Sequence, residues 1–230
     1  MIAKKRLKVG VIRFPGSNCD FDTLHFFKKF GHKAEFIWYK DVSIPRYDLL
    51  VLPGGFAFGD RVYAKATGHY DIDPGVLAIS SPVLKAIKRV VRLGVPILGI
   101  CNGFQILVKA GLLPGKLVQN DSKKFFCDYV RCAVQGASFF GDPSMLGKTF
   151  IIPVAHGYGR YIASARLLNR LQKNKQIFLR YSTFNPNGSA LNIAGVCNEQ
   201  KTIFGMMPHP ERSLDGKYFM RAIETYVAGN

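Results

Sequence analysis

Apolar residues along this chain form short continuous runs that alternate with amphipathic segments, a pattern typical of buried strands followed by covering helices. In the first half, the predicted strands span Lys8–Phe14, Ala34–Trp38, Asp48–Leu52 and Val95–Ile100. The helices predicted between and after them span Asp20–Phe30, Ser81–Arg92 and Asn102–Ala110. This alternation predicts an α/β fold, with a mostly parallel sheet and helices on both of its faces.

The second half of the chain is richer in predicted strands. They span Phe125–Val134, Thr149–Ala155, Gln176–Tyr181, Ile193–Cys197 and Thr202–Met206. A last helix is predicted over Lys217–Val227. The sequence has 230 residues and no internal repeat, so we expect one domain covering residues 1–230.

The composition is that of a globular protein, with 48% hydrophobic and 13% aromatic residues. No apolar run approaches the length that a membrane-spanning helix requires. The basic segment Met1–Arg6 is followed by a short predicted strand, where a signal peptide would have an apolar core and a cleavage site. We therefore expect a cytoplasmic protein without a membrane partner.

The cysteines limit the structural chemistry of the chain. There are five of them, an odd number, and no Cys-x-x-Cys pair occurs. This usage argues against a disulfide framework and against a structural zinc site, so we expect no metal centre.

The chain carries a formal net charge of +17, which raises the alternative of a nucleic-acid-binding protein. The basic residues are nevertheless spread along the sequence, and the densest runs, Lys4–Arg6 and Lys123-Lys124, are short. No helix-turn-helix, RNA-recognition or zinc-finger pattern occurs. We expect no nucleic-acid partner and interpret the charge as favouring solubility or an acidic protein partner.

Cys101 occupies the most informative position in the sequence. It follows the predicted strand Val95–Ile100, precedes a predicted helix, and is flanked by Gly99 and Gly103. The pattern Gly-x-Cys-x-Gly between strand and helix is the cysteine version of a nucleophile elbow. The helix N-terminus favours a thiolate there. A buried structural cysteine is the plain alternative, but the two glycines and the strand-to-helix position favour a nucleophile.

His209 and Glu211 follow the last predicted strand. Two residues apart in an extended segment, their side chains can point the same way, so that the carboxylate accepts from one ring nitrogen while the other faces Cys101. Cysteine, histidine and glutamate together form a complete set for acyl transfer.

Gly54 and Gly55 follow the third predicted strand and are the candidate oxyanion loop. A backbone without side chains can present its N–H groups to a developing negative charge, and the N–H of Asn102 would be the second donor. This loop, the elbow and the His209 segment all follow strands, so they are expected to meet at the carboxyl edge of a parallel sheet.

These motifs resemble the class I (triad-type) glutamine amidotransferases, and within them the small glutaminase subunits that serve a synthetase of purine biosynthesis. The segments that carry the resemblance are Pro15–Asp20, Pro53–Phe56 with Gly59-Asp60, Gly99–Leu107, Pro153–Gly157, Asn185–Ser189 and Gly205–Arg212. The resemblance implies a flavodoxin-like amidotransferase fold. It also implies that Gln105, His156 and Gly157 belong to the glutamine-binding region.

The resemblance further implies the reaction and its partners. Cys101, His209 and Glu211 would hydrolyse glutamine, and the ammonia would pass to a large synthetase subunit that converts formylglycinamide ribonucleotide to the amidine. ATP and magnesium are expected on that partner, a small accessory subunit can complete the complex, and no cofactor is expected in this chain.

The sequence departs from the family at Arg61–Pro74 and at Tyr158. Two rival functions stay open at this point. One is a glutaminase serving a different synthetase, which the Cys-Asn-Gly-Phe-Gln motif disfavours. The other is a redox or stress protein with a reactive elbow cysteine, which would have no need of His209 and Glu211.

Overall fold

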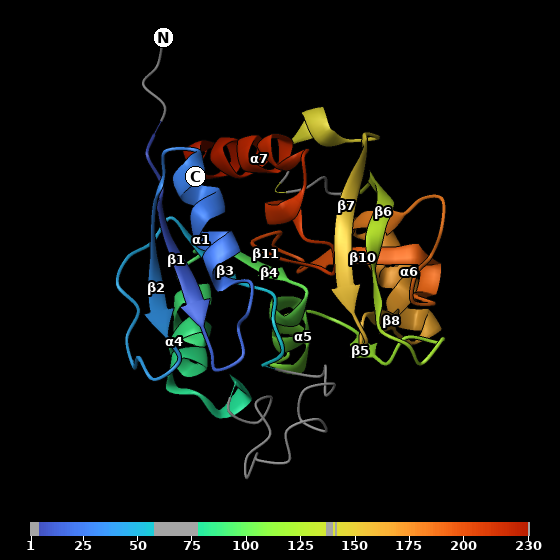
Figure 1. Ribbon diagram of the computed structural model, residues 1–230, viewed down its shortest axis with the longest axis horizontal. Coiled ribbons are helices and arrows are strands. Elements are labelled where there is room, and N and C mark those ends of the chain that lie inside the picture. The colour runs from blue at the N-terminus through green and yellow to red at the C-terminus, as the bar shows by residue number, and fades with distance from the viewer. Residues whose placement is uncertain (1–4, 58–77, 137–139, 141, 230) are drawn as a thin grey trace.

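The computed structural model describes residues 5–57, 78–136, 140 and 142–229, and its centre is a nine-stranded sheet (Figure 1). The order of strands across this sheet is β2-β1-β3-β4-β11-β10-β9-β6-β7. Its strands are β1 (Lys8–Arg13), β2 (Lys33–Trp38), β3 (Leu49–Leu52), β4 (Ile97–Ile100), β6 (Phe126–Val134), β7 (Thr149–His156), β9 (Ile177–Tyr181), β10 (Ile193–Cys197) and β11 (Ile203–Met206). A separate two-stranded sheet pairs β5 (Lys116–Val118) with β8 (Arg160–Ile162).

Helices cover both faces of the central sheet. They are α1 (Asp20–Lys29), α4 (Pro82–Val91), α5 (Asn102–Lys109), α6 (Ala165–Lys173) and α7 (Gly216–Gly229), with short 3-10 helices η2 (Pro143–Met145), η3 (Ala190–Asn192) and η4 (Pro210–Arg212). Figure 1 shows α1 and α7 on one side of the sheet and α4 and α5 on the other. This arrangement confirms the α/β class with helices on both faces.

The sheet is mixed, and its two kinds of pairing are segregated. β2, β1, β3, β4 and β11 pair in parallel, whereas β11–β10, β10–β9, β9–β6 and β6–β7 pair antiparallel. Short turns explain part of the antiparallel half, because the five residues between β10 and β11 cannot make the longer crossover that a parallel pair needs. The sequence pattern predicted the strands well but gave no direct information on their direction in this half.

The hydrophobic core extends along both the parallel and the antiparallel half of the sheet. Every residue of β3 and β4 is buried, as continuous apolar runs of this length predict for strands covered on both faces. Helix α4 begins at a Ser81 cap whose side chain accepts a hydrogen bond from the backbone N–H of Leu84, with Pro82 in the first turn. Helix α6 and strands β5 and β8 were not predicted from the sequence.

One consequence of the topology locates the candidate site. The loops after β1, β3, β4 and β11 all leave the same edge of the sheet, because these strands run in parallel. Among the described residues, no helix has both the length and the apolar character needed to cross a membrane.

Candidate active site

The backbone at Cys101 forms a sharp turn between β4 and α5. Cys101 is the N-cap residue of α5 and has φ 48° and ψ −102°, which non-glycine residues seldom adopt. Its backbone N–H donates to Met206 O at 2.7 Å, so the strained residue is tied to the neighbouring strand β11. A conformation of this kind costs on the order of 1–3 kcal/mol and is maintained by the surrounding structure. The predicted nucleophile elbow is therefore present in the backbone geometry.

Gly99 and Gly103, which flank Cys101, lie where a larger side chain would clash with its neighbours. A Cβ atom at Gly103 would lie 2.0 Å from the carbonyl oxygen of Leu52, and one at Gly99 would lie 2.5 Å from a methyl carbon of Leu107. The first clash is with backbone and cannot be relieved by rotating a side chain. These contacts let α5 begin directly against β3, which brings the Cys101 thiol to the edge of the sheet.

His209 and Glu211 are held together immediately after β11. The Nδ1 atom of His209 lies 2.7 Å from Oε1 of Glu211, and both side chains are buried. Glu211 belongs to the turn of 3-10 helix η4, which folds its carboxylate back toward the ring. The structure thus brings the two predicted side chains together, through a 3-10 turn and not through the extended segment that the sequence suggested.

The charges around His209 favour its protonated form. Burial alone lowers the pKa of the imidazole, but the negative charge of Glu211 and the neighbouring Cys101 outweigh burial and raise it well above the usual value. Hydrogen bonding with the Cys101 and Cys19 side chains also raises it. Nε2 of His209 makes no hydrogen bond of standard geometry within the described part of the chain, so it remains able to exchange a proton with Cys101 or a substrate.

The edge strand β7 contributes backbone groups to both reacting side chains. The Cys101 thiol donates a long hydrogen bond to Ala155 O, with 3.6 Å between the two atoms. The backbone N–H of His209 donates to Pro153 O at 2.9 Å. Cys101 and His209, which follow strands of the parallel half of the sheet, are thus both hydrogen-bonded to the antiparallel half.

The Gly54-Gly55 loop is packed between the first loop of the chain and the base. A Cβ atom at Gly55 would lie 2.4 Å from Gly16 O, and one at Gly54 would lie 2.6 Å from Cε1 of His209. The backbone N–H of Phe56 donates to Gly16 O at 2.7 Å and fixes the loop there. The predicted oxyanion loop therefore lies next to His209.

Asn102 and Gln105 hold the nucleophile helix to the opposite loop. The Asn102 amide donates to Oε1 of Gln105 at 2.9 Å, and Nε2 of Gln105 donates to Tyr158 O at 2.8 Å. The Gln105 side chain, which the family resemblance placed in the glutamine-binding region, is thus bonded within the protein. Tyr158, where the sequence departs from the family, is the partner at the other end of this link.

His156 is the centre of a buried polar network. Its Nδ1 lies 3.2 Å from Oδ1 of Asn120, and its Nε2 lies 3.5 Å from Nδ2 of Asn187. Asn120 also receives hydrogen bonds from Gly159 N and donates to His156 O, while its own backbone N–H donates to Gly157 O. Burial, and then the charge of His209, lower the pKa of His156 to about 4, so this imidazole is neutral at physiological pH.

Sequence reasoning did not single out Cys19 as a site residue. One ligand-type atom of Cys19, one of His209 and one of Glu211 all lie within 4.8 Å of one another. The available signal was the position of the Pro15–Asp20 motif directly after β1, at the same edge as the other loops. All five cysteines are free thiols, and Cys127 is the exposed one.

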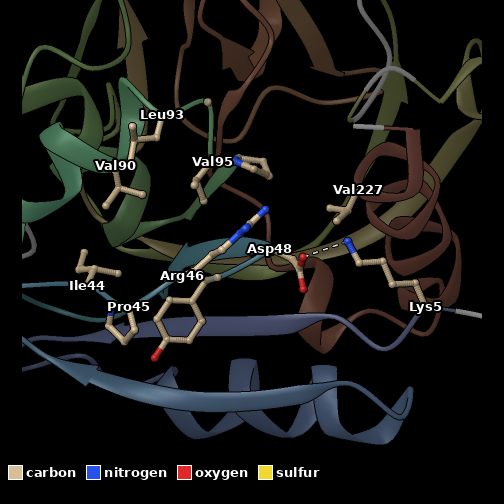
Figure 2. A pocket seen from close by; sticks show the side chains of 12 residues that line it. Lys5, Ile44, Pro45, Arg46, Asp48, Val90, Leu93, Val95 and Val227 are labelled. Atoms are coloured by element: carbon tan, nitrogen blue, oxygen red, sulfur yellow. Dashed lines mark ion pairs between the residues drawn. The ribbon is translucent and has the colours of Figure 1, made fainter.

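The molecule also has a hollow at the opposite edge of the sheet, at the amino ends of β3 and β4 (Figure 2). It encloses about 520 Å³, and in it Lys5 points to Asp48 with 3.1 Å between Nζ and Oδ1. Arg46 extends into the same hollow, whose walls include Val90 and Val227 (Figure 2). None of the predicted site residues lines it.

The variant loop Arg61–Pro74 lies outside the described residues.

Comparison with known proteins identifies the family of the chain. Residues 6–224 match the CobB/CobQ-like glutamine amidotransferase domain. The chain is 42% identical over 211 residues to phosphoribosylformylglycinamidine synthase subunit PurQ of Wolinella succinogenes, covering 91% of this chain and 92% of that protein. It is 43% identical over 219 residues to the PurQ subunit of Thermomicrobium roseum, covering 91% and 89%.

Solved structures give the same result for the fold. A chain in the structure of PurLQS from Thermotoga maritima superimposes with a TM-score of 0.82 at 35% identity, covering 97% of this chain and all of that one. A putative GMP synthase component from Thermoplasma acidophilum shares the fold, with a TM-score of 0.67 at 16% identity over 98% and 96% of the two chains. The chain belongs to the CobB/CobQ-like glutamine amidotransferase family, within its branch of phosphoribosylformylglycinamidine synthase PurQ subunits.

Proposed function

We propose that this chain is the glutaminase subunit of a phosphoribosylformylglycinamidine synthase and that it releases ammonia from glutamine at Cys101. One observation carries the proposal. A buried imidazole lies 2.7 Å from a buried carboxylate and beside a cysteine held in a strained strand-to-helix turn. That combination supports a thiolate nucleophile and a base that is oriented to serve it.

The reaction begins with the Cys101 thiolate attacking the side-chain carbonyl carbon of glutamine. The oxygen of the tetrahedral intermediate accepts hydrogen bonds from the backbone N–H groups of Gly55 and Asn102. Protonated His209 gives its proton to the departing ammonia as the carbon–nitrogen bond breaks, which leaves a thioester. His209 then takes a proton from water, the water oxygen attacks the thioester, and glutamate and the free thiolate are released.

The other predicted binding residues support this centre indirectly. The side chains of Gln105 and His156 are engaged in hydrogen bonds to Tyr158, Asn120 and Asn187. We assign them the role of holding the loop at Gly157 in place, where its backbone borders glutamine. Gly54 has a related role, because its lack of a side chain lets the backbone of the loop pack against the His209 ring.

The ammonia serves a second protein of the complex. A large synthetase subunit, which holds ATP and magnesium, converts formylglycinamide ribonucleotide to the amidine, and a small accessory subunit completes the complex. The similarity to a chain of the Thermotoga maritima PurLQS structure supports an assembly of this kind. The whole chain acts as one glutaminase domain in the cytoplasm, without a cofactor of its own.

The decisive experiment replaces the nucleophile in the reconstituted complex. Cys101→Ala should abolish activity with glutamine and spare activity with added ammonium, because Cys101 serves only the release of ammonia. Cys127→Ala, at an exposed thiol, is the matched control and should keep both activities. Loss of both activities in Cys101→Ala would assign the cysteine a structural role, and retention of glutamine-dependent activity would refute the proposed nucleophile.

A further inference from the structure

Cys19 is fixed against the catalytic base by its backbone. It is the N-cap residue of α1 and is buried. Its N–H donates to Gly54 O at 3.1 Å, and its carbonyl oxygen accepts from the backbone N–H of Thr23 at 3.0 Å and from Oγ1 of Thr23 at 2.9 Å. These bonds hold the thiol between α1 and the Gly54 loop.

The Cys19 thiol and the ring of His209 both border the position that a side chain at Gly54 would occupy. A Cβ atom built on Gly54 would lie 3.1 Å from Sγ of Cys19 and 2.6 Å from Cε1 of His209, so the same small space borders both groups. The Cys19 side chain is also close enough to hydrogen-bond His209. Cys19 therefore adds a second thiol to the surroundings of the base, in addition to Cys101.

The three side chains together supply a mixed set of metal ligands. Ligand-type atoms of Cys19, His209 and Glu211 lie within 4.8 Å of one another. Nε2 of His209 and Oε2 of Glu211 are buried and make no hydrogen bond of standard geometry within the described part of the chain. Sulfur, imidazole nitrogen and carboxylate oxygen are the ligand types that zinc accepts in tetrahedral sites.

We propose that Cys19, His209 and Glu211 form a reversible binding site for a thiophilic divalent cation such as Zn²⁺, and that the bound ion switches the glutaminase off. Binding releases the thiol proton of Cys19 and any proton on the coordinating imidazole nitrogen. The thiolate and the carboxylate then balance the two charges of the ion. A water molecule can complete a four-coordinate site.

The spacing indicates a regulatory ion and not a structural one. Ligand atoms around tetrahedral zinc lie about 3.5 Å apart, given metal–ligand distances of about 2.0–2.3 Å. The side chains must therefore close in by roughly 1 Å around the ion from separations of up to 4.8 Å. Nearby Arg212, which interacts with Cys19 and Glu211 and is paired with Asp22, adds a positive charge beside the site and so opposes a permanently bound cation.

Inhibition follows from the identity of the ligands. An imidazole that coordinates a metal cannot accept and return a proton, and a carboxylate that coordinates the metal cannot orient that imidazole. This consequence rests on the proposed function, whereas the binding of the ion does not.

Binding can be measured on the full chain by calorimetric titration with ZnCl₂ and by the thiolate charge-transfer absorption of added Co²⁺. Cys19→Ala should weaken Zn²⁺ binding at least about tenfold and remove the thiolate absorption that Cys19 gives. Glu211→Gln, which leaves both thiols in place, should weaken binding while keeping that absorption. Cys127→Ala, at the exposed cysteine, is the matched control and should bind as the wild type does.

Cys101→Ser separates the metal site from the reaction. This variant lacks the proposed nucleophile but keeps all three ligands, so it should bind Zn²⁺ as tightly as the wild type does. Unchanged binding in both Cys19→Ala and Glu211→Gln would overturn the proposal. So would loss of binding in Cys101→Ser alone, because the ion would then lie between Cys101 and His209.

Activity adds a second readout on the reconstituted complex. Zn²⁺ should inhibit glutamine-dependent turnover and leave ammonium-dependent turnover unchanged. Cys19-dependent binding in a chain without any glutaminase activity would refute the proposed function and keep the metal site. Glutaminase activity without Cys19-dependent binding would refute the metal site alone.

Discussion

Gly54 lies so close to the ring of His209 that a methyl group at this glycine would be 2.6 Å from Cε1. The backbone of the proposed oxyanion loop therefore also packs against the imidazole of the proposed base. Glu211 binds the ring through Nδ1, so the position of the imidazole is set by the Glu211 carboxylate on one side and by the backbone of Gly54 on another. Any group larger than hydrogen at position 54 must displace one of them.

The first prediction concerns this contact. Gly54→Ala should lower glutamine-dependent kcat by at least about tenfold, or about 1.4 kcal/mol of transition-state stabilisation, because the ring must move away from Cys101. Ammonium-dependent activity should be unchanged. Gly94→Ala is the control, since Gly94 has a positive φ but open space around its Cβ position. Equal kinetic losses in the two variants would show that the contact is unimportant.

The second prediction ranks the base and its orienting group. His209→Ala should reduce glutamine-dependent kcat by about 10²–10⁴-fold, because the imidazole moves the protons. Glu211→Ala should cost less, because the carboxylate orients the ring and stabilises its charged form. Steady-state kinetics of both variants in the complex would check the order. A larger loss in Glu211→Ala would contradict these roles.

The third prediction concerns the pH dependence of kcat/KM. Burial lowers the pKa of His209, and the charges of Glu211 and Cys101 raise it well above its usual value. Glu211→Gln removes one of the negative charges that raise the pKa of His209. The imidazolium should then lose its proton at a lower pH, and the alkaline limb of the profile should shift to lower pH. Glu224→Gln is the control, because Glu224 pairs with His32 at 2.8 Å instead. An unmoved alkaline limb would show that Glu211 does not set this pKa.

The fourth prediction concerns stability in acid. The pKa of His156 is lowered to about 4, and an unfolded chain has a histidine pKa of about 6.5. The unfolded chain therefore takes up the proton first, and stability present above pH 6.5 is lost as the pH falls toward 4, by up to about 3 kcal/mol. His156→Asn should flatten this decline in urea unfolding experiments at several pH values. His25→Asn, at an exposed histidine, should leave the slope as it is.

The fifth prediction concerns the net charge of +17. We expect the chain to associate with an acidic face of its synthetase partner. The association rate constant should then fall by about tenfold or more as the salt concentration rises from about 50 to 500 mM, with a much smaller change in the dissociation rate. Stopped-flow mixing of the purified subunits would measure both. An association rate independent of salt would exclude electrostatic steering.

The central elements of the fold could be predicted from the sequence because their signals are local. The continuous apolar run before Cys101, the flanking glycines and the following helix all lie between Val95 and Ala110. The observed β4 and α5 agree with the prediction to within two residues at each end. The partnership of His209 and Glu211 is equally local. Contacts between such neighbours depend little on the rest of the chain.

The features that were missed depend on distant parts of the chain. Strands β5 and β8 have three residues each and form only by pairing with each other across more than forty residues. Helix α6 is a different case, because its Ser164 cap and the helical spacing of Leu167, Leu168 and Leu171 are local signals that were present in the sequence and were not used. Cys19 and Glu211 come from opposite ends of the sequence, so no motif spacing reveals that they lie near each other.

The backbone of β7 also has a mechanical consequence. Two carbonyl groups of this one edge strand, at Pro153 and Ala155, accept hydrogen bonds from His209 and Cys101. The distance between these two acceptors is fixed by the pitch of a single strand, so displacement of the strand changes the surroundings of both reacting groups together. A shift of β7 would therefore alter the hydrogen bonds of Cys101 and His209 at the same time.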